Sequence, residues 1–454
     1  MADVVVIGAG LAGMAAAARL AKARHRVTLL EARDRLGGAW AARELDETVV
    51  DAAPPIFSFP APWRDLFRKS GRALEAEFAR SGDELVDAEP TRHVFADGSS
   101  FVLPIGRGDQ DAAISERFGR PVADRWRDLV DGLGDVWQAL RPLGIEAELR
   151  SREQLTRPVK KALLHRQSVA DLARRMDHPQ LSAVITDLAY AAGSVPERTP
   201  AFCAVQLYLD RTFGRWTAGS GTTLISSLQQ RLALRKVDVR TGTRATGIGP
   251  DGRTVSTEDG PLTVDAVVAT CDPEQLYRDL LPDTVAGTER RLLRRLPGAL
   301  RPTVTLDWAE PHPTDEAVPG TATPADPTSP DSTIGPESPA GPAHPTASDA
   351  PTETVWHRST GGPLIEYTRP AAGRTVLIRH DYADAEPDRS AGVGWNGFRH
   401  WLDRPPASSE PAGLFIAGPS SRGGPAPSMQ VLSGALAAYG CQHLIAPDRP
   451  LEPR

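Results

Sequence analysis

The 454-residue sequence has few cysteines and no long hydrophobic segment, and each scarcity excludes a class of protein. Its three cysteines, Cys203, Cys271 and Cys441, are far apart and match no zinc-binding or redox spacing, which argues against a disulfide scaffold and a structural metal. The uncharged run from Val4 to Ala18 follows Asp3 instead of a positively charged segment, which is not typical of a signal peptide. No other run reaches the roughly 18 apolar residues of a membrane span. We therefore expect a cytoplasmic protein, attached at most to a membrane surface.

The sequence also has no strong excess of basic over acidic residues or the reverse. The formal net charge is -6, and residues 309–354 alone hold eight acidic residues with no lysine or arginine, so the rest of the chain is slightly basic. This balance does not suggest a nucleic-acid partner. With 40% hydrophobic residues, the chain has the composition of a globular protein with two or three domains.

The first forty residues have the pattern of a dinucleotide-binding βαβ unit. A β-branched run ends at Ile7, an alanine-rich helical run follows, and a second apolar run at residues 27–30 returns as a parallel strand. In the Gly-x-Gly-x-x-Gly turn between them, Gly8 permits the bend, Gly10 lets a pyrophosphate approach backbone amides, and Gly13 lets the helix pack closely on the strand. Glu31 follows Gly13 by eighteen residues, where a carboxylate can accept hydrogen bonds from an adenosine ribose.

The residues that follow Glu31 distinguish a flavin from a nicotinamide. The stretch Ala32-Arg33-Asp34-Arg35-Leu36-Gly37-Gly38 resembles the FAD-binding signature of the flavin amine oxidase and phytoene desaturase superfamily. The resemblance implies FAD as the cofactor, with the glycine pair close to its pyrophosphate and ribityl chain. The sequence departs from the pattern at Ala39, where many members have a basic residue.

Two further motifs resemble this superfamily. Residues 51–54 resemble a loop that runs beneath the isoalloxazine ring, with Ala53 in place of the usual glycine. Near the C-terminus, an apolar strand ends at Gly418 and a helix begins near Ser428. A helix N-terminus directed at a flavin stabilises the negative charge that develops when the ring accepts a hydride. Here Pro419 replaces the Asp or Glu of many relatives.

Weaker matches lie between the ends of the chain. They include Pro200-Ala201 after a helix, a glycine-rich turn at residues 216–225, and strands at 237–240, 253–257 and 266–270. The resemblance implies the following FAD-binding residues: Gly8, Ala9, Gly10, Leu11, Ala12, Gly13, Glu31, Ala32, Gly37, Gly38, Ala245, Gly418, Met429, Gln430 and Val431. It implies no catalytic residue that a motif could identify.

The region between the motifs has the features of a substrate domain. Residues 93–103 alternate around Asp97-Gly98, which predicts a hairpin. Residues 110–140 have helical periodicity, with a core-facing stripe at Leu129, Leu133, Val136, Trp137 and Leu140. Residues 150–175 carry eight basic residues, typical of a solvated face or, alternatively, of a peripheral contact with an anionic membrane. His357 and His380 lie in predicted strands, where a structural role is the favoured interpretation over acid-base catalysis.

The resemblance implies an α/β fold with a discontinuous, Rossmann-like FAD-binding domain and an inserted α+β substrate domain. Residues 309–354, with eleven prolines and almost no large apolar side chain, are predicted to be disordered. The FAD-binding domain comprises residues 1–75, 216–285 and 411–446, the substrate domain 76–215, 286–308 and 355–410, and the tail 447–454.

Three functions remain open. The first is a phytoene desaturase-like oxidoreductase that transfers a hydride from a hydrophobic, isoprenoid or carotenoid-like substrate to FAD. The second is a flavin amine oxidase, which would need aromatic residues around the amine; Trp40 and Tyr439 are the nearby candidates. The third is a flavin-retaining isomerase or a non-redox binding homologue, which the departures at Ala39, Ala53 and Pro419 favour. The oligomeric state is not predicted.

Overall fold

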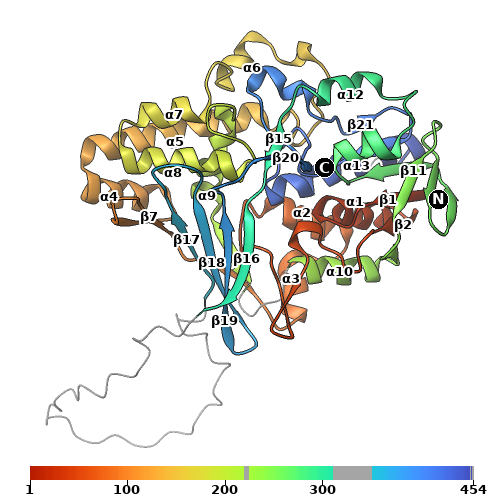
Figure 1. The fold of residues 1–454 in the computed structure, drawn as a ribbon, viewed down its shortest axis with the longest axis horizontal. Helices are drawn as coiled ribbons and strands as arrows, with labels where there is room; N and C mark the ends of the chain where they lie inside the picture. The colour runs from red at the N-terminus through yellow and green to blue at the C-terminus, as the bar shows by residue number, and fades with distance from the viewer. Residues whose placement is uncertain (219–223, 310–349, 450, 452–454) are drawn as a thin grey trace, which may run out of the picture.

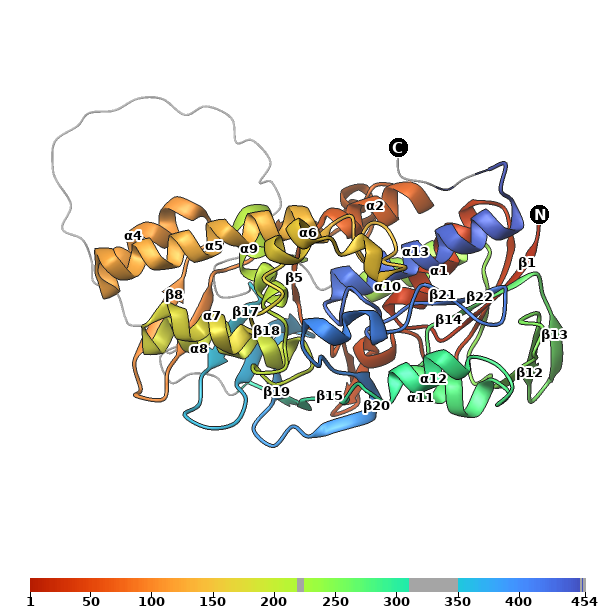
Figure 2. The ribbon, with the colours of Figure 1, turned by 90° about the horizontal axis from the view of Figure 1, so that it is seen from above.

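The computed structural model describes residues 1–218, 224–309, 350–449 and 451. Figures 1 and 2 show two lobes: one holds the N-terminal strand and the C-terminal helix, and the other consists of a mainly antiparallel sheet with helices beside it. The chain passes between the lobes several times, so the first lobe is assembled from segments that lie far apart in the sequence.

The first lobe is built on a six-stranded sheet with the order β10-β2-β1-β14-β22-β21. All neighbours are parallel except β21 and β22. The strands are β1 (Asp3–Ile7), β2 (Arg26–Leu30), β10 (Asp238–Arg240), β14 (Ala266–Ala269), β21 (Ser408–Ser409) and β22 (Leu414–Ile416). Both faces of this sheet are covered, since alternate residues of β1 lie in different hydrophobic cores. This explains why its central strands are continuous apolar runs.

Helices from both ends of the chain pack together on one face of this sheet. That layer contains α1 (Leu11–Lys22), α2 (Ala61–Ser70), α3 (Leu74–Arg80), α10 (Leu224–Leu234) and α13 (Pro427–Ile445). α1 and α13 approach closely, because a Cβ added at Gly434 would lie 2.4 Å from the Ala12 carbonyl oxygen. The other face is covered by β11 (Ala245–Ile248), β12 (Thr254–Thr257), β13 (Gly260–Thr263), α11 (Pro273–Gln275), η4 (Leu276–Leu280) and α12 (Gly287–Leu293). The predicted α/β fold is thereby confirmed.

The second lobe contains a six-stranded sheet with the order β16-β19-β18-β17-β7-β8. Its strands are β7 (Thr91–Val94), β8 (Ser100–Leu103), β16 (Thr303–Trp308), β17 (Thr352–Trp356), β18 (Leu364–Ala371) and β19 (Arg374–Asp381). β7 and β8 form the predicted hairpin. Its helices are α4 (Arg107–Phe118), α5 (Arg120–Leu140), α6 (Arg157–Ala162), α7 (Val169–Met176), α8 (Pro179–Ala191) and α9 (Val205–Phe213). The helical prediction for 110–140 is confirmed with a break at Gly119, whose φ is +92°.

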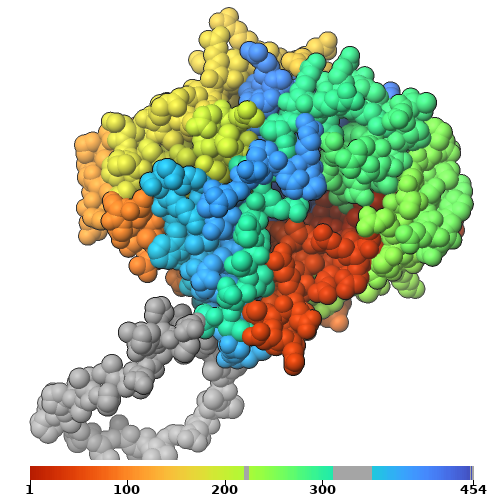
Figure 3. All heavy atoms as spheres, in the orientation of Figure 1, coloured from red at the N-terminus to blue at the C-terminus, as the bar shows by residue number. Residues whose placement is uncertain are grey.

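Short elements join the lobes. They are η1 (Gly38–Trp40), β3 (Arg43–Leu45), β4 (Thr48–Val50), β5 (Ile56–Ser58), β6 (Leu85–Asp87), η2 (Arg152–Gln154), η3 (Ala201–Ala204), β9 (Arg215–Ala218), β15 (Gly298–Leu300), β20 (Pro387–Val393) and η5 (Phe398–Asp403). The β3–β4 hairpin contacts β16. The Trp308 indole donates a hydrogen bond to the Asp46 carboxylate at 3.0 Å, and the Arg43 side chain donates one to the Val304 carbonyl at 3.3 Å. In the space-filling view, these N-terminal residues, drawn in red, adjoin the blue-green surface of the second lobe (Figure 3).

Most of the predicted disordered segment, residues 310–349, lies outside the described residues. Its C-terminal boundary was wrong, because residues 352–354 belong to β17 and pair with β18. The reason is tertiary: Glu353 is 9% exposed and forms an ion pair with Arg215, a contact that local composition does not indicate. Most of the predicted glycine motif, residues 219–223, also lies outside the described ranges.

The basic segment 150–175 is not one cationic helix. It contains η2, α6 and most of α7, and the apolar side of α7 is buried in the core of the second lobe. Within the described ranges, no helix combines the length and the hydropathy needed to cross a bilayer.

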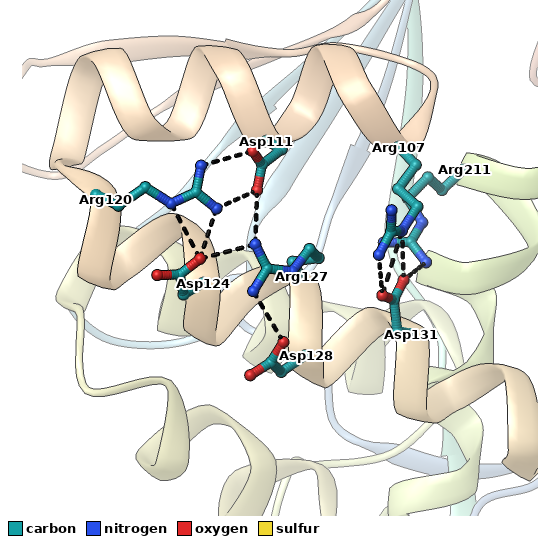
Figure 4. A network of polar contacts seen from close by, with 8 residues as sticks. All are labelled: Arg107, Asp111, Arg120, Asp124, Arg127, Asp128, Asp131 and Arg211. Atoms are coloured by element: carbon teal, nitrogen blue, oxygen red, sulfur yellow. Dashed lines mark hydrogen bonds and ion pairs between the residues drawn. The ribbon is translucent and has the colours of Figure 1, made fainter.

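Charged side chains tie α4, α5 and α9 together on the surface of the second lobe (Figure 4). Arg120 binds Asp111 and Asp124, and Arg127 binds Asp124 and Asp128. Such exposed pairs contribute little individually. The contact between Arg211 and Asp131 differs, since the Arg211 side chain is only 5% exposed, and it fixes α9 against α5 at 2.6 Å.

Candidate flavin and substrate site

The turn after β1 has the close packing that the glycine spacing predicts. Gly8 has a φ of +98°, and its amide donates to the Leu30 carbonyl at 2.8 Å. A Cβ added at Gly13 would lie 1.9 Å from the Gly8 carbonyl oxygen, which no side chain tolerates. The Thr270 hydroxyl, at the end of β14, donates to the same oxygen at 2.8 Å. The sequence motif did not reveal Thr270, because it joins the turn from 260 residues away.

The N-terminus of α1 leaves room for an anion. Gly10 is its N-cap, no side chain caps the helix, and a Cβ added at Gly10 would meet no atom within 4 Å. The first-turn amides, which include those of Leu11, Ala12 and Gly13, have no intrahelical acceptors. Free amides and the positive end of the helix dipole suit a pyrophosphate. This open, uncapped turn fits FAD.

Glu31 lies beside the same turn. Its side chain is largely buried, Oε2 accepts a hydrogen bond from the Ala9 amide at 2.9 Å, and Oε1 accepts one from the Arg33 amide at 3.0 Å. The carboxylate is therefore held next to the turn, as a ribose-binding acid requires. Ala32 is exposed, and Ala245 is buried in the core that also contains Leu30.

The glycine pair crosses the N-terminus of α1. The Gly37 amide donates to the Ala9 carbonyl at 2.9 Å. Gly38 has a φ of +62°, and a Cβ there would lie 3.2 Å from the Gly10 Cα. The two glycine motifs thus meet in space. Ala39, in the place of the basic residue, is exposed.

The C-terminal motif joins this site from the neighbouring strand. Gly418 follows β22 with a φ of +128°, and its amide donates to the Ser433 hydroxyl of α13 at 3.0 Å. No side chain caps α13. The Met429 side chain is buried in the core of the second lobe and the Val431 side chain in that of the first. The Gln430 side chain donates a hydrogen bond to the Pro425 carbonyl at 2.8 Å. These residues would therefore meet a cofactor through the backbone.

A buried arginine holds the loop after Gly418. The Arg404 guanidinium donates to the carbonyl oxygens of Val393, Gly394, Pro419 and Ser421 at 2.9–3.1 Å, and it lies 4.2 Å from the ring centre of Trp395. Burial lowers the pKa of Arg404 to about 10, which leaves it charged at neutral pH. No sequence pattern indicates this role, because every residue type carries a backbone carbonyl that could accept the hydrogen bond.

Two hollows lie beside the predicted flavin loop. The inner one, of about 30 Å³, has a largely apolar wall that includes Trp40, Ala53, Pro54, Phe57, Leu224 and Ile225. The outer cleft, of about 400 Å³, is lined in part by Arg35, Leu36, Val49 and Ala371. Asp51, Ile225, Arg369 and Pro370 line both.

Three histidines lie in or next to strands of the second sheet: His93 in β7, His357 just after β17, and His380 in β19. His357 Nε2 lies 2.9 Å from His93 Nδ1, and His357 Nδ1 lies 2.6 Å from an Asp187 carboxylate oxygen. Burial, together with His357, holds the pKa of His93 well below its usual range. Burial also lowers the pKa of His380 to about 4. These histidines are paired or neutral in the core, in agreement with the structural interpretation.

A charged cluster lies near His93. Arg215 binds Glu353 through Nη2 at 2.7 Å and donates to the Thr91 hydroxyl through Nη1. The Thr91 hydroxyl in turn donates to Glu353 at 2.7 Å. Burial raises the pKa values of Asp210 and Tyr367, both of which are near Arg215. The interior beside the second sheet is therefore not fully apolar.

The structure brings together the motifs at residues 8–13, 31, 37–38 and 418, which the sequence could only assign separately. Their contact with FAD stays a prediction. Tyr439, in contrast, does not line the described hollows: its hydroxyl accepts from Arg19 at 3.3 Å and from Lys69 at 3.4 Å.

Comparison with known sequences identifies relatives among carotenoid enzymes. The chain is 30% identical to a phytoene dehydrogenase of Streptomyces griseus over 287 residues, which cover 61% of this chain and 55% of the relative. It is 27% identical to a lycopene-forming phytoene desaturase of a Paracoccus species, with 63% and 58% covered. The chain thus spans little more than half the length of these relatives.

Comparison with solved structures gives similar folds at low identity. Wild-type putrescine oxidase bound to putrescine superposes with a TM-score of 0.63 at 14% identity, covering 98% of both chains. Cyclohexylamine oxidase from Brevibacterium oxydans gives 0.60 at 13% identity, covering 98% of this chain and 99% of the oxidase. These likenesses establish the fold.

Residues 11–356 match the family described as flavin containing amine oxidoreductase. The match covers three quarters of the chain, begins within the glycine turn at Leu11, includes the Gly37-Gly38 loop, and agrees with the fold and with FAD as the cofactor. The resemblance drawn from the motifs is confirmed: the chain belongs to the flavin containing amine oxidoreductase family.

Proposed function

We propose that this chain is an FAD-dependent dehydrogenase that oxidises a long apolar, isoprenoid or carotenoid-like substrate. The observation that carries the proposal is the likeness to relatives named phytoene dehydrogenase and phytoene desaturase. The apolar wall beside the flavin loop, which includes Trp40, Pro54 and Phe57, is compatible with it. Apolar walls with few polar groups are typical of sites for hydrophobic ligands.

The reaction would remove a hydride and a proton from neighbouring carbons, so that a carbon–carbon double bond forms. When bound, FAD accepts the hydride. The turn at Gly10, the carboxylate of Glu31 and the Gly37-Gly38 loop would hold the cofactor. The apolar wall would orient the chain and exclude water, and the proton would leave to solvent through the outer cleft.

An amine oxidase is the second candidate, and the amine oxidases of similar fold favour it. Against it, the two aromatic residues expected around an amine are not together. Trp40 lines the inner hollow, but the Tyr439 ring is in contact with the cations of Arg19 and Lys69, at 5.6 and 5.7 Å.

The first experiment is to purify the protein, record its visible absorption and identify any chromophore released by heat. We expect a yellow protein with stoichiometric FAD. Under anaerobic conditions, a polyene substrate should bleach the flavin and an amine should not. A colourless protein that takes up no added FAD would refute the proposal, and bleaching by amines alone would favour an amine oxidase.

A further inference from the structure

The two hollows meet at a polar pair. Asp51 and Arg369 line both the inner hollow and the outer cleft, and most of the remaining inner wall is apolar. Their side chains are 11% and 8% exposed, and Asp51 Oδ2 lies 3.6 Å from Arg369 Nη1. A buried ion pair therefore lies where a ligand would pass from the wetter cleft to the drier hollow.

The two oxygens of Asp51 have different surroundings. Oδ1 accepts a hydrogen bond from the Ala53 amide at 2.9 Å, which fixes the side chain to the loop. Oδ2 is buried and has no hydrogen-bond donor among the described residues, since 3.6 Å to Arg369 exceeds a hydrogen bond. Buried acceptors are nearly always paired, so this oxygen is a candidate partner for a ligand's donor group.

The charges of Asp51 and Arg369 indicate which kind of donor group would bind at Oδ2. Because Arg369 already balances Asp51, an ammonium ligand at Oδ2 would lie close to a second cation. A hydroxyl group donates one hydrogen bond and carries no charge, so it avoids this repulsion. The outer cleft of about 400 Å³ has room for a hydrocarbon chain, and the apolar wall beside the pair would meet the part of that chain next to the hydroxyl.

We propose that Asp51 Oδ2 accepts a hydrogen bond from a hydroxyl group on the long apolar substrate. The contact fixes the position of the chain along the flavin loop and so determines which bond is oxidised. This assignment rests on the proposed function, which supplies the apolar chain and the location of the flavin next to residues 51–54.

The test compares three C20 isoprenoid probes with the same carbon skeleton: the alcohol geranylgeraniol, its hydrocarbon without the hydroxyl, and the primary amine. Binding to the holoenzyme is measured by quenching of tryptophan emission, to which Trp40 contributes. We expect the alcohol to bind about tenfold more tightly than the hydrocarbon, because the hydrocarbon leaves the acceptor unpaired.

Asp51→Asn is the diagnostic variant. Its amide oxygen can still accept from Ala53, while an NH₂ group replaces Oδ2. We expect the alcohol-to-hydrocarbon ratio of dissociation constants to fall from about ten to about one. Glu47→Gln, on the neighbouring exposed hairpin, removes the same charge and should keep the ratio of the wild type.

Arg369→Gln provides an independent variant if Asp51→Asn does not fold. Without the guanidinium the unbalanced carboxylate should favour the amine, so amine affinity should rise about tenfold relative to the alcohol. Equal affinities for alcohol and hydrocarbon in the wild type, a ratio unchanged in Asp51→Asn, or tightest binding of the amine to the wild type would each overturn the assignment.

The proposed function is judged separately by anaerobic bleaching of the flavin. If the alcohol preference depends on Asp51 but no polyene bleaches the flavin, the assignment of Asp51 stands and the dehydrogenase proposal fails. If polyenes bleach the flavin equally with and without a hydroxyl, in the wild type and in Asp51→Asn, the dehydrogenase proposal stands and the role of Asp51 is refuted.

Discussion

Gly10 and Gly13 belong to the same turn, but their missing side chains face different surroundings. A methyl group at Gly13 would overlap the Gly8 carbonyl oxygen, whereas one at Gly10 would enter open space at the end of α1. We therefore expect Gly10 to be needed for the ligand and Gly13 for the fold.

This difference predicts opposite results for two alanine variants. Gly13→Ala should lower the free energy of unfolding by about 3 kcal/mol, because the helix must move off the strand. Gly10→Ala should leave that free energy within about 0.5 kcal/mol and weaken FAD binding at least about tenfold, because the methyl group occupies the approach to the amides. Chemical denaturation and titration of the apoprotein with FAD measure the two effects. Equal loss of FAD binding and of stability in both variants would contradict this assignment.

A second residue-scale prediction concerns acid stability. His380 is partly buried next to Tyr367 and is close to Arg43 and Glu353, and its folded pKa is about 4 against an ordinary value of 6.5. The unfolded chain therefore takes up a proton as the pH falls below 6.5, while the folded protein stays neutral there. Stability is full above pH 6.5 and should fall by about 3 kcal/mol towards pH 4 on account of this group.

His380→Gln removes the titrating group, so its free energy of unfolding should depend less steeply on pH between 6.5 and 4. Denaturant titrations at several pH values compare the two proteins. Identical slopes in the variant and the wild type would show that other groups, such as His93, account for the loss.

At the scale of the elements, the loop between β22 and α13 depends on one side chain. Arg404→Met should remove hydrogen bonds to four carbonyl groups and lower the free energy of unfolding by about 3 kcal/mol. Because the loop begins at Gly418, FAD retention should fall as well. The neighbouring exposed Arg399, changed to Met, provides the matched control and should have the stability of the wild type. Equal unfolding midpoints for the two variants would contradict a holding role for Arg404.

Several elements were predictable for local reasons. β1, α1 and β2, the hairpin of β7 and β8, and the buried side of α5 each follow from the periodicity of their own residues. The start of β17 did not, because its pairing with β18 and the ion pair of Glu353 bring in partners from distant segments.

At the scale of the whole molecule, the insertion is predicted to be dispensable. We expect a chain in which residues 311–348 are replaced by a ten-residue Gly/Ser linker to fold and to retain FAD. β16 and β17 are separated by two strands, or about 15 Å, which the linker spans easily. Its melting temperature should lie within a few degrees of the wild type.

A longer deletion serves as the contrast. Removal of residues 309–354 also removes Glu353, and the buried Arg215 loses its partner. We expect a loss of about 3 kcal/mol relative to the shorter deletion. Equal stability of the two deletions would show that the Arg215–Glu353 pair does not anchor β17.

The sequence by itself determined the fold class, the family and the glycine motifs. Each of the motifs that indicate them lies within a stretch of at most about forty residues. Only the tertiary structure decided how Thr270 locks the glycine turn, how Arg404 holds the loop after Gly418, and that Asp51 meets Arg369. These contacts join residues from segments far apart in the chain, and hydrogen bonds to backbone carbonyls leave no trace in residue type. Strand pairing and tertiary packing, not local pattern, bring these groups together.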